Sequence, residues 1–204
     1  MEQIPFPDKK YQIIYADPPW KYGCWYKSED VKRNAADHYA VMPSTELKNL
    51  PVKTVSMKDA VLIMWVTYPC LKEGIALMET WGFTYKTIAF TWVKKNKKSD
   101  TWFFGLGNYT RANAEIALLG TRGKGLPRIS RSVPQICDAR IMEHSQKPSE
   151  IRDKIVELFG DLPRIELFAR QRTPGWDCWG NEVQSSGANV TPCNASITPQ
   201  GELL

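Results

Sequence analysis

The strongest constraint on the fold of this chain is the alternation of short apolar runs with stretches of helical periodicity. Helices are expected over residues 69–81 and 149–159, and each is followed by a glycine, Gly82 or Gly160, as is common just past a helix end. The runs expected to form strands are residues 11–16, 60–66, 83–93, 114–119 and 165–169. Strands that alternate with helices predict an α/β domain with a mainly parallel sheet.

The composition indicates one globular domain followed by a polar tail. The chain has 204 residues, 43% of them hydrophobic and 24% charged, and no apolar run approaches the length of a membrane span. We expect the domain to span residues 1–183, and residues 184–204, rich in small polar residues, to form a disordered tail. The N-terminus lacks a basic start and an apolar signal core, so we expect the protein in the cytosol of its host cell.

The cysteines and histidines do not suggest a metal site. The five cysteines are scattered without a C-x-x-C pair, and His38 and His144 are the only histidines. Free thiols in a reducing compartment explain this pattern better than bound zinc, so we expect no metal.

A carboxylate, two prolines and a tryptophan follow the first expected strand. Pro18 and Pro19 lack an N–H and fix φ, so they stop the strand and stiffen its exit. We expect Asp17 and a proline carbonyl, with no competing donor nearby, to accept hydrogen bonds from an amino group on a flat ring. Trp20 would stack on that ring. The alternative is an ordinary strand-ending turn with a core tryptophan.

A basic block and two aromatic segments favour a partner that carries phosphates. Residues 86–131 hold ten Lys and Arg side chains against Asp100 and Glu115, a net charge of +8, although a solvated surface is the alternative. Segments 21–43 and 94–113 interleave aromatic and basic side chains as nucleic-acid-binding loops do; small hydrophobic clusters under the loops are the alternative. The side chains expected to contact substrate are Tyr22, Trp25, His38, Tyr39, Trp102, Asn108, Tyr109 and Arg111.

Further polar side chains surround the last expected strand. Ligands of open α/β sheets bind at the carboxyl ends of strands, where both Asp17 and Arg170 are expected. Lys147 precedes a helix start, and a cation beside free backbone N–H groups suits a carboxylate, although a surface lysine is the alternative. Asn181 and Glu182 suit the paired hydroxyls of a ribose. A dinucleotide site of the usual type is disfavoured because the chain has no G-x-G-x-x-G.

Four motifs, in their order, resemble those of the MT-A70 family of S-adenosylmethionine-dependent adenine-N6 methyltransferases. They are Asp17-Pro18-Pro19-Trp20, His144-Ser145-x-Lys147-Pro148, Ile165-Glu166-Leu167-Phe168-Ala169-Arg170 and Trp179-Gly180-Asn181-Glu182, and the match spans about residues 11–183. The resemblance implies an enzyme with a Rossmann-like class I methyltransferase fold and helices on both faces of a mainly parallel sheet. It also implies a permuted motif order, with the catalytic half ahead of the cofactor half, and S-adenosylmethionine as the cofactor.

The resemblance also implies roles for individual residues. Lys147 would hold the cofactor carboxylate, Phe168 and Arg170 would flank the cofactor, and Asn181 and Glu182 would hold its ribose. The catalytic residues would be Asp17, Pro18, Pro19 and Trp20, and Asp17 would also contact the cofactor. In two respects the chain departs from the larger members. The larger members contact the cofactor adenine from a segment ahead of the first strand, but only ten residues precede Tyr11 here. In addition, Glu182 stands where the mRNA enzymes have a glutamine.

The resemblance leaves the nucleic acid open. Eukaryotic members methylate adenosine in mRNA, and short bacterial and phage-borne members methylate adenine in DNA. This compact chain resembles the short type, so DNA is favoured over RNA, for a monomer or a homodimer.

Two other functions are less favoured. Degenerate scaffold partners of the mRNA enzyme have lost the catalytic acid, which Asp17 retains. In protein glutamine methyltransferases the cofactor strand precedes an Asn-Pro-Pro-Tyr turn, whereas here Phe168 follows Asp17.

Overall fold

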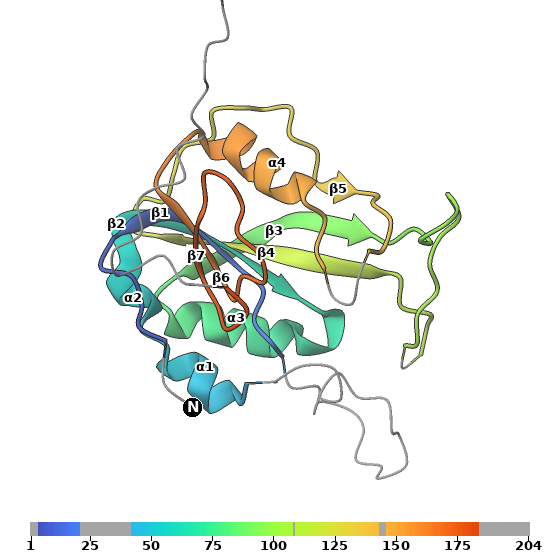
Figure 1. Cartoon of the computed structure of the whole chain (residues 1–204), viewed down its shortest axis with the longest axis horizontal. Coiled ribbons are helices and arrows are strands. Elements are labelled where there is room, and N and C mark those ends of the chain that lie inside the picture. Colours follow the sequence, from blue (N-terminus) through green and yellow to red (C-terminus); the bar gives the residue numbers. More distant parts are fainter. Residues whose placement is uncertain (1–3, 21–41, 108, 143–145, 184–204) are drawn as a thin grey trace, which may run out of the picture.

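A seven-stranded sheet with helices on both faces forms the described part of the protein (Figure 1). This computed structural model describes residues 4–20, 42–107, 109–142 and 146–183. The strands are β1 (Tyr11–Ala16), β2 (Ser56–Val66), β3 (Thr84–Val93), β4 (Ala114–Arg122), β5 (Ile136–Cys137), β6 (Arg164–Leu167) and β7 (Asp177–Trp179). The helices are α1 (Ser44–Asn49), α2 (Val52–Val55), α3 (Leu71–Thr80) and α4 (Glu150–Phe159), with a 3₁₀ turn at Tyr68–Cys70.

The sheet is mainly parallel, as the sequence predicted. Its strand order is β5-β3-β4-β2-β1-β6-β7, and β1 runs parallel to both β2 and β6. Among the described strands, β4 is the one that runs against its neighbours, β2 and β3. The connection from β3 to β4 therefore leaves the sheet at the edge where β1, β2 and β6 have their carboxyl ends. This common edge carries the site described below.

The two faces of the sheet bury alternate residues of each strand. Ile14 packs on the face covered by α1, α2 and α3, in one cluster with Leu77 of α3. Ile13 packs on the opposite face, in a cluster with Ile155 of α4. Because both faces are covered, every residue from 60 to 66 in β2 is buried, which explains its unbroken apolar run.

The long elements lie where the periodicity placed them, and the short ones were not foreseen. The helical stretch expected over residues 69–81 is the 3₁₀ turn followed by α3, and Gly82 and Gly160 end their helices with φ of +83° and +91°. The elements α1, α2, β5 and β7 have two to six residues, too few to produce a periodic pattern.

Some expectations fall beyond what the structure describes. No helix among the described residues is long and apolar enough to cross a bilayer. Residues 184–204 and most of segment 21–43 lie outside the described ranges, so the disordered tail and the boundary at residue 183 stay predictions.

Candidate active site

The Asp17-Pro18-Pro19-Trp20 turn lies at the carboxyl end of β1, between the ends of β2 and β6. The Trp20 N–H donates to the Pro18 carbonyl at 2.8 Å, and the Met42 N–H donates to the Pro19 carbonyl at 3.1 Å. The expectation that these carbonyls lack a nearby donor was therefore wrong, because the turn folds back on itself and pairs with the segment at Met42. A carbonyl oxygen has two lone pairs, so each can accept a second hydrogen bond.

The Trp20 ring is held in one orientation. Its indole N–H donates to the carbonyl of Trp65, near the end of β2, at 3.1 Å. The half-buried ring packs against the apolar cluster on the α1–α3 face of the sheet. The ring therefore borders the same strand ends as Asp17 and is fixed before any ligand arrives.

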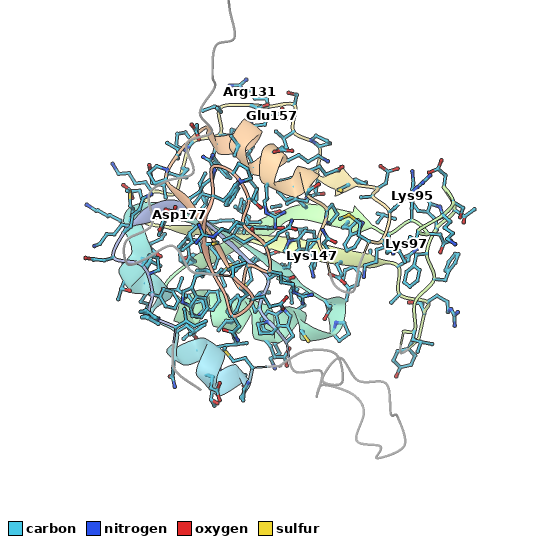
Figure 2. The ribbon with its side chains drawn as sticks, in the orientation of Figure 1. Lys95, Lys97, Arg131, Lys147, Glu157 and Asp177 are labelled. Atoms are coloured by element: carbon cyan, nitrogen blue, oxygen red, sulfur yellow. The ribbon has the colours of Figure 1, made fainter. Side chains whose placement is uncertain are left out.

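A chain of alternating charges leads from Asp17 into the protein. Lys147 Nζ lies 3.0 Å from Asp17 Oδ2 and 3.1 Å from Glu115 Oε2, and Lys94 Nζ lies 2.6 Å from Glu115 Oε1. The Lys147 side chain is only 8% exposed, and Figure 2 shows it beside the strands of the sheet. Four parts of the chain meet here: the ends of β1 and β3, the start of β4 and the segment before α4.

Burial and charge act in opposite directions on these groups. Burial raises the pKa of Asp17, and the neighbouring Lys147 offsets only part of that rise. Burial alone would raise the pKa of Glu115, but Lys147 and Lys94 outweigh it and hold that pKa below its ordinary value. Burial alone would lower the pKa of Lys147, but Asp17 and Glu115 outweigh it and raise that pKa. Lys147 is therefore a firmly charged ammonium next to a carboxyl that protonates more readily than an exposed aspartate.

A pocket of about 280 Å³ opens beside Asp17. Three acidic and three basic side chains line it, so the lining is close to neutral and suits a ligand that carries charges of both signs. The full lining is Tyr15, Asp17, Gln146, Lys147, Arg152, Glu166, Phe168, Arg170, Gln171 and Glu182. The pocket thus brings together five of the six residues that the sequence linked to a cofactor. The sixth, Asn181, is exposed and is not part of the lining.

The sequence reasoning missed a buried ion pair in the pocket lining. Arg152 donates from Nε and Nη2 to the two oxygens of Glu166, at 2.7 and 2.6 Å, and both side chains are about nine-tenths buried. The Arg152 guanidinium also lies over the Tyr15 ring, whose hydroxyl accepts a hydrogen bond from the Trp65 indole. One signal was present, because a lone acid within an apolar strand requires a buried cationic partner.

The pocket edge formed by β6 and β7 contains unusual backbone. Phe168 has φ of +62°, a left-handed conformation that is uncommon outside glycine and that clusters at functional sites. Its ring is held there by stacking on Trp81 and by an edge contact with Trp179. Across from it, a Cβ on Gly180 would lie 2.3 Å from the Ala169 carbonyl oxygen, so glycine allows the two strand ends to approach this closely.

The residues expected to contact substrate are only partly described. Trp102, Tyr109 and Arg111 lie in the connection between β3 and β4, are exposed, and are not part of the pocket lining. The other five, Tyr22, Trp25, His38, Tyr39 and Asn108, lie outside the described residues, and the role of all eight stays a prediction.

The mainly parallel seven-stranded sheet, with its reversed strand β4, is the fold of a Rossmann-like methyltransferase. The MT-A70 family model matches residues 11–182, and the chain belongs to the MT-A70 family. The family and the fold class that the sequence predicted are thereby confirmed.

The chain is similar to bacterial and eukaryotic relatives. It is 38% identical to the type II methyltransferase M.MunI of Mycoplasma sp, over 97% of this chain and 85% of that protein. It is 26% identical to the human N(6)-adenosine-methyltransferase catalytic subunit METTL3, and 27% identical to an Arabidopsis thaliana N(6)-adenosine-methyltransferase MT-A70-like protein. Both matches cover 85% of this chain but only 28% and 24% of those longer proteins.

Proposed function

We propose that the protein transfers a methyl group from S-adenosylmethionine to the exocyclic N6 amine of adenine in DNA. The observation that carries this proposal is the turn at the end of β1, where the Asp17 carboxylate and the Pro18 carbonyl stand beside a charged pocket and a fixed Trp20 ring. The names of the eukaryotic relatives, which specify N(6)-adenosine methylation, support adenine as the base.

The lining of the pocket supports S-adenosylmethionine as the donor. The methionine end of this molecule is a zwitterion, which suits a pocket lined by equal numbers of acids and bases. We assign its carboxylate to Lys147 and its ribose hydroxyls to Asn181 and Glu182, with Phe168 and Arg170 flanking the molecule. When bound, S-adenosylmethionine supplies an electrophilic methyl group on a positively charged sulfur.

Asp17 and the Pro18 carbonyl are the groups that would prepare the amine. The lone pair of the adenine amine is delocalised into the ring, which makes the nitrogen a poor nucleophile. Two fixed acceptors for its two N–H groups favour a pyramidal nitrogen whose lone pair is available for attack. Only the ionised Asp17 is purely an acceptor, and the adjacent Lys147 ammonium at 3.0 Å stabilises that form against burial.

Trp20 is the group that would hold the base. An indole ring offers a large apolar face on which any base can stack, and the hydrogen bond to Trp65 fixes the direction of that face. If the substrate is duplex DNA, the adenine has to leave the stack to reach this turn.

The similarity to the bacterial relative favours DNA over RNA. The chain spans 85% of the bacterial relative but about a quarter of the two eukaryotic ones. The match to the bacterial relative extends over most of both sequences and at higher identity, and the short bacterial members that this chain resembles methylate DNA. The net charge of +8 over residues 86–131 provides affinity for either phosphate backbone.

The test is to sequence DNA and RNA from cells that express either the wild type or the Asp17→Ala variant, with a method that reports methylated adenine. We expect N6-methyladenine at one DNA motif in wild-type cells and none with Asp17→Ala. Methyl marks in RNA alone would contradict the choice of polymer.

The purified variants test the assigned role of Asp17. The Asp17→Ala variant is expected to bind S-adenosylmethionine in calorimetry yet to transfer no methyl group, and near-normal transfer would refute the mechanism. Asp161→Ala is a suitable control, because that exposed carboxylate pairs with Arg164 and does not line the pocket.

A further inference from the structure

The connection between β3 and β4 lies within residues 94–113, and its described residues, 94–107 and 109–113, project from the sheet as an arm (Figure 1). Antiparallel bridges pair Lys95 with Trp102 and Gly105 with Ala112. Large apolar side chains of the arm are exposed rather than packed: Trp102 by 44%, Phe104 by 58%, Leu106 by 82% and Tyr109 by 93%. Exposed apolar groups gathered on one projection mark an interaction site.

The arm has a defined shape. A Cβ on Gly107 would lie 1.9 Å from the Thr110 carbonyl oxygen, so glycine is required for this close approach. At its base, Lys95 exchanges backbone hydrogen bonds with Ala139 and Ile141, and its ammonium pairs with Asp138 at 2.8 Å. The apolar side chains are therefore presented on a braced support, which reduces the entropy lost on binding.

The charge of the arm identifies the partner that it fits. The arm contains five basic residues and one acid, Asp100, a net charge of +4. Lys97, Lys98 and Arg111 are exposed among the apolar side chains, and Figure 2 shows Lys95 and Lys97 on the projecting segment. A second copy of the same surface would place +4 against +4. A nucleic acid instead provides anions for the cations and ring faces for the apolar groups.

The base of the arm is joined to the methyl-transfer site. Lys94, its first residue, binds Glu115, and Glu115 and Asp17 share Lys147. The arm also leaves the sheet at the edge that carries Asp17. The arm and the Asp17 turn therefore lie at the same edge of the sheet.

We infer that the arm is a wedge that enters the base stack of duplex DNA next to the target adenine. The inference rests on the proposed function and specifies how that site reaches a paired base. Leu106 and Tyr109 would occupy the space that the displaced adenine leaves, as apolar side chains do when they separate base steps. Lys97, Lys98 and Arg111 would pair with the flanking phosphates.

The test compares two synthetic duplexes that contain the DNA motif found by sequencing. One duplex is fully paired. The other, the unpaired duplex, lacks the base opposite the target adenine, so that moving the adenine out of the stack costs less free energy. The test variant is Leu106→Ser/Tyr109→Ser. The control is Ile129→Ser, which removes an apolar side chain that is 67% exposed elsewhere on the surface.

The wedge predicts a loss that depends on the duplex. The double variant is expected to methylate the paired duplex at least about tenfold more slowly than the wild type, and the unpaired duplex within about threefold of it. The control variant should match the wild type on both duplexes. Thermal denaturation of the double variant should match that of the wild type, because both changed side chains are exposed.

Three other outcomes would overturn the inference. Equal losses on both duplexes would mean that the arm only binds DNA or supports the fold, and no loss on either would mean that it does neither. A dimer in sedimentation that the double variant converts to a monomer, with equal losses, would make the arm a contact between copies. Failure of the proposed function is distinguishable, because the wild type itself would then methylate neither duplex. That result would also refute the wedge inference, which depends on the proposed function.

Discussion

Arg152 and Glu166 allow a quantitative test of the buried charges that line the pocket. Their bidentate hydrogen bonds are 2.6 and 2.7 Å long, and their side chains are 10% and 9% exposed. We consider Arg152→Met, Glu166→Gln and the double variant. Each single change leaves one buried charge without its partner, whereas the double change leaves none.

The two single variants should be strongly destabilised. Breaking a buried pair by removing one partner costs about 3–5 kcal/mol, a large part of the roughly 5–15 kcal/mol that stabilises a typical domain. For a chain of this size each kcal/mol lowers the melting temperature by about 2–4 °C, so we expect a decrease of roughly 6–20 °C. The double variant should recover much of this loss, with a coupling free energy of roughly 2–3 kcal/mol.

The pH dependence separates the two single variants. Burial raises the pKa of Glu166 above its ordinary value, and Arg152 offsets part of that rise, so Arg152→Met raises it further. A carboxyl whose pKa is higher in the folded than in the unfolded protein binds more protons when folded. Its effect on stability therefore becomes less favourable as the pH rises through the folded pKa. The deficit of Arg152→Met should shrink on acidification, whereas Glu166→Gln retains a guanidinium that does not titrate.

Urea denaturation followed by tryptophan fluorescence, at about pH 8 and about pH 5.5, measures these quantities for all four proteins. Single-variant losses that add within about 0.5 kcal/mol would refute the coupling of the two charges. A deficit of Arg152→Met that is the same at both pH values would refute the assignment of the cost to an ionised Glu166.

Two further predictions concern the Asp17 turn. Because burial raises the pKa of Asp17 and only the ionised form serves as a pure acceptor, single-turnover methyl transfer should decline on acidification at a higher pH than an exposed aspartate would give. Glu115→Gln, which removes a negative charge that adds to this rise, should move the decline to lower pH, and an unmoved decline would count against the assignment. Trp20→Phe keeps a ring but loses the hydrogen bond to Trp65, so kcat/KM should fall about tenfold, against roughly a hundredfold for Trp20→Ala. Equal losses for the two Trp20 variants would refute the stacking role, because the phenyl ring would then contribute no more than the methyl group of alanine.

The parts of the fold that the sequence predicted are those that produce a local pattern. The strand at residues 11–16 and the helix α4 were readable because burial imposes an apolar run on the first and a one-sided periodicity on the second. The direction of β4 was not readable, since an apolar run is the same in either direction. Strands of two or three residues, such as β5 and β7, are defined by pairing with distant partners and leave no pattern of their own.

The candidate site was predictable where a motif ends a strand or, as for Lys147, precedes a helix. Asp17, Phe168 and Arg170 follow apolar strands, and the expectation that these two strand ends share a crevice agrees with the pairing of β1 with β6. Glu115 and Arg152 lie inside regular elements and act through partners that are distant in sequence. Such side chains can be assigned only once the topology is known.

The pairing of β1 with β6 has a consequence for the timing of activity during synthesis. In this pairing Ile13 lies opposite Arg164, and Ala16 lies opposite Leu167. The strand β6 borders β1 on the side away from β2, but it follows β1 to β5 in the sequence. A growing chain has therefore synthesised most strands of the sheet before β6 leaves the ribosome. Contacts so far apart in sequence also form late and slowly. The Asp17 turn is made early, but its pocket closes only when β6 arrives, so we expect nascent and prematurely terminated chains to carry the turn without modifying nucleic acid.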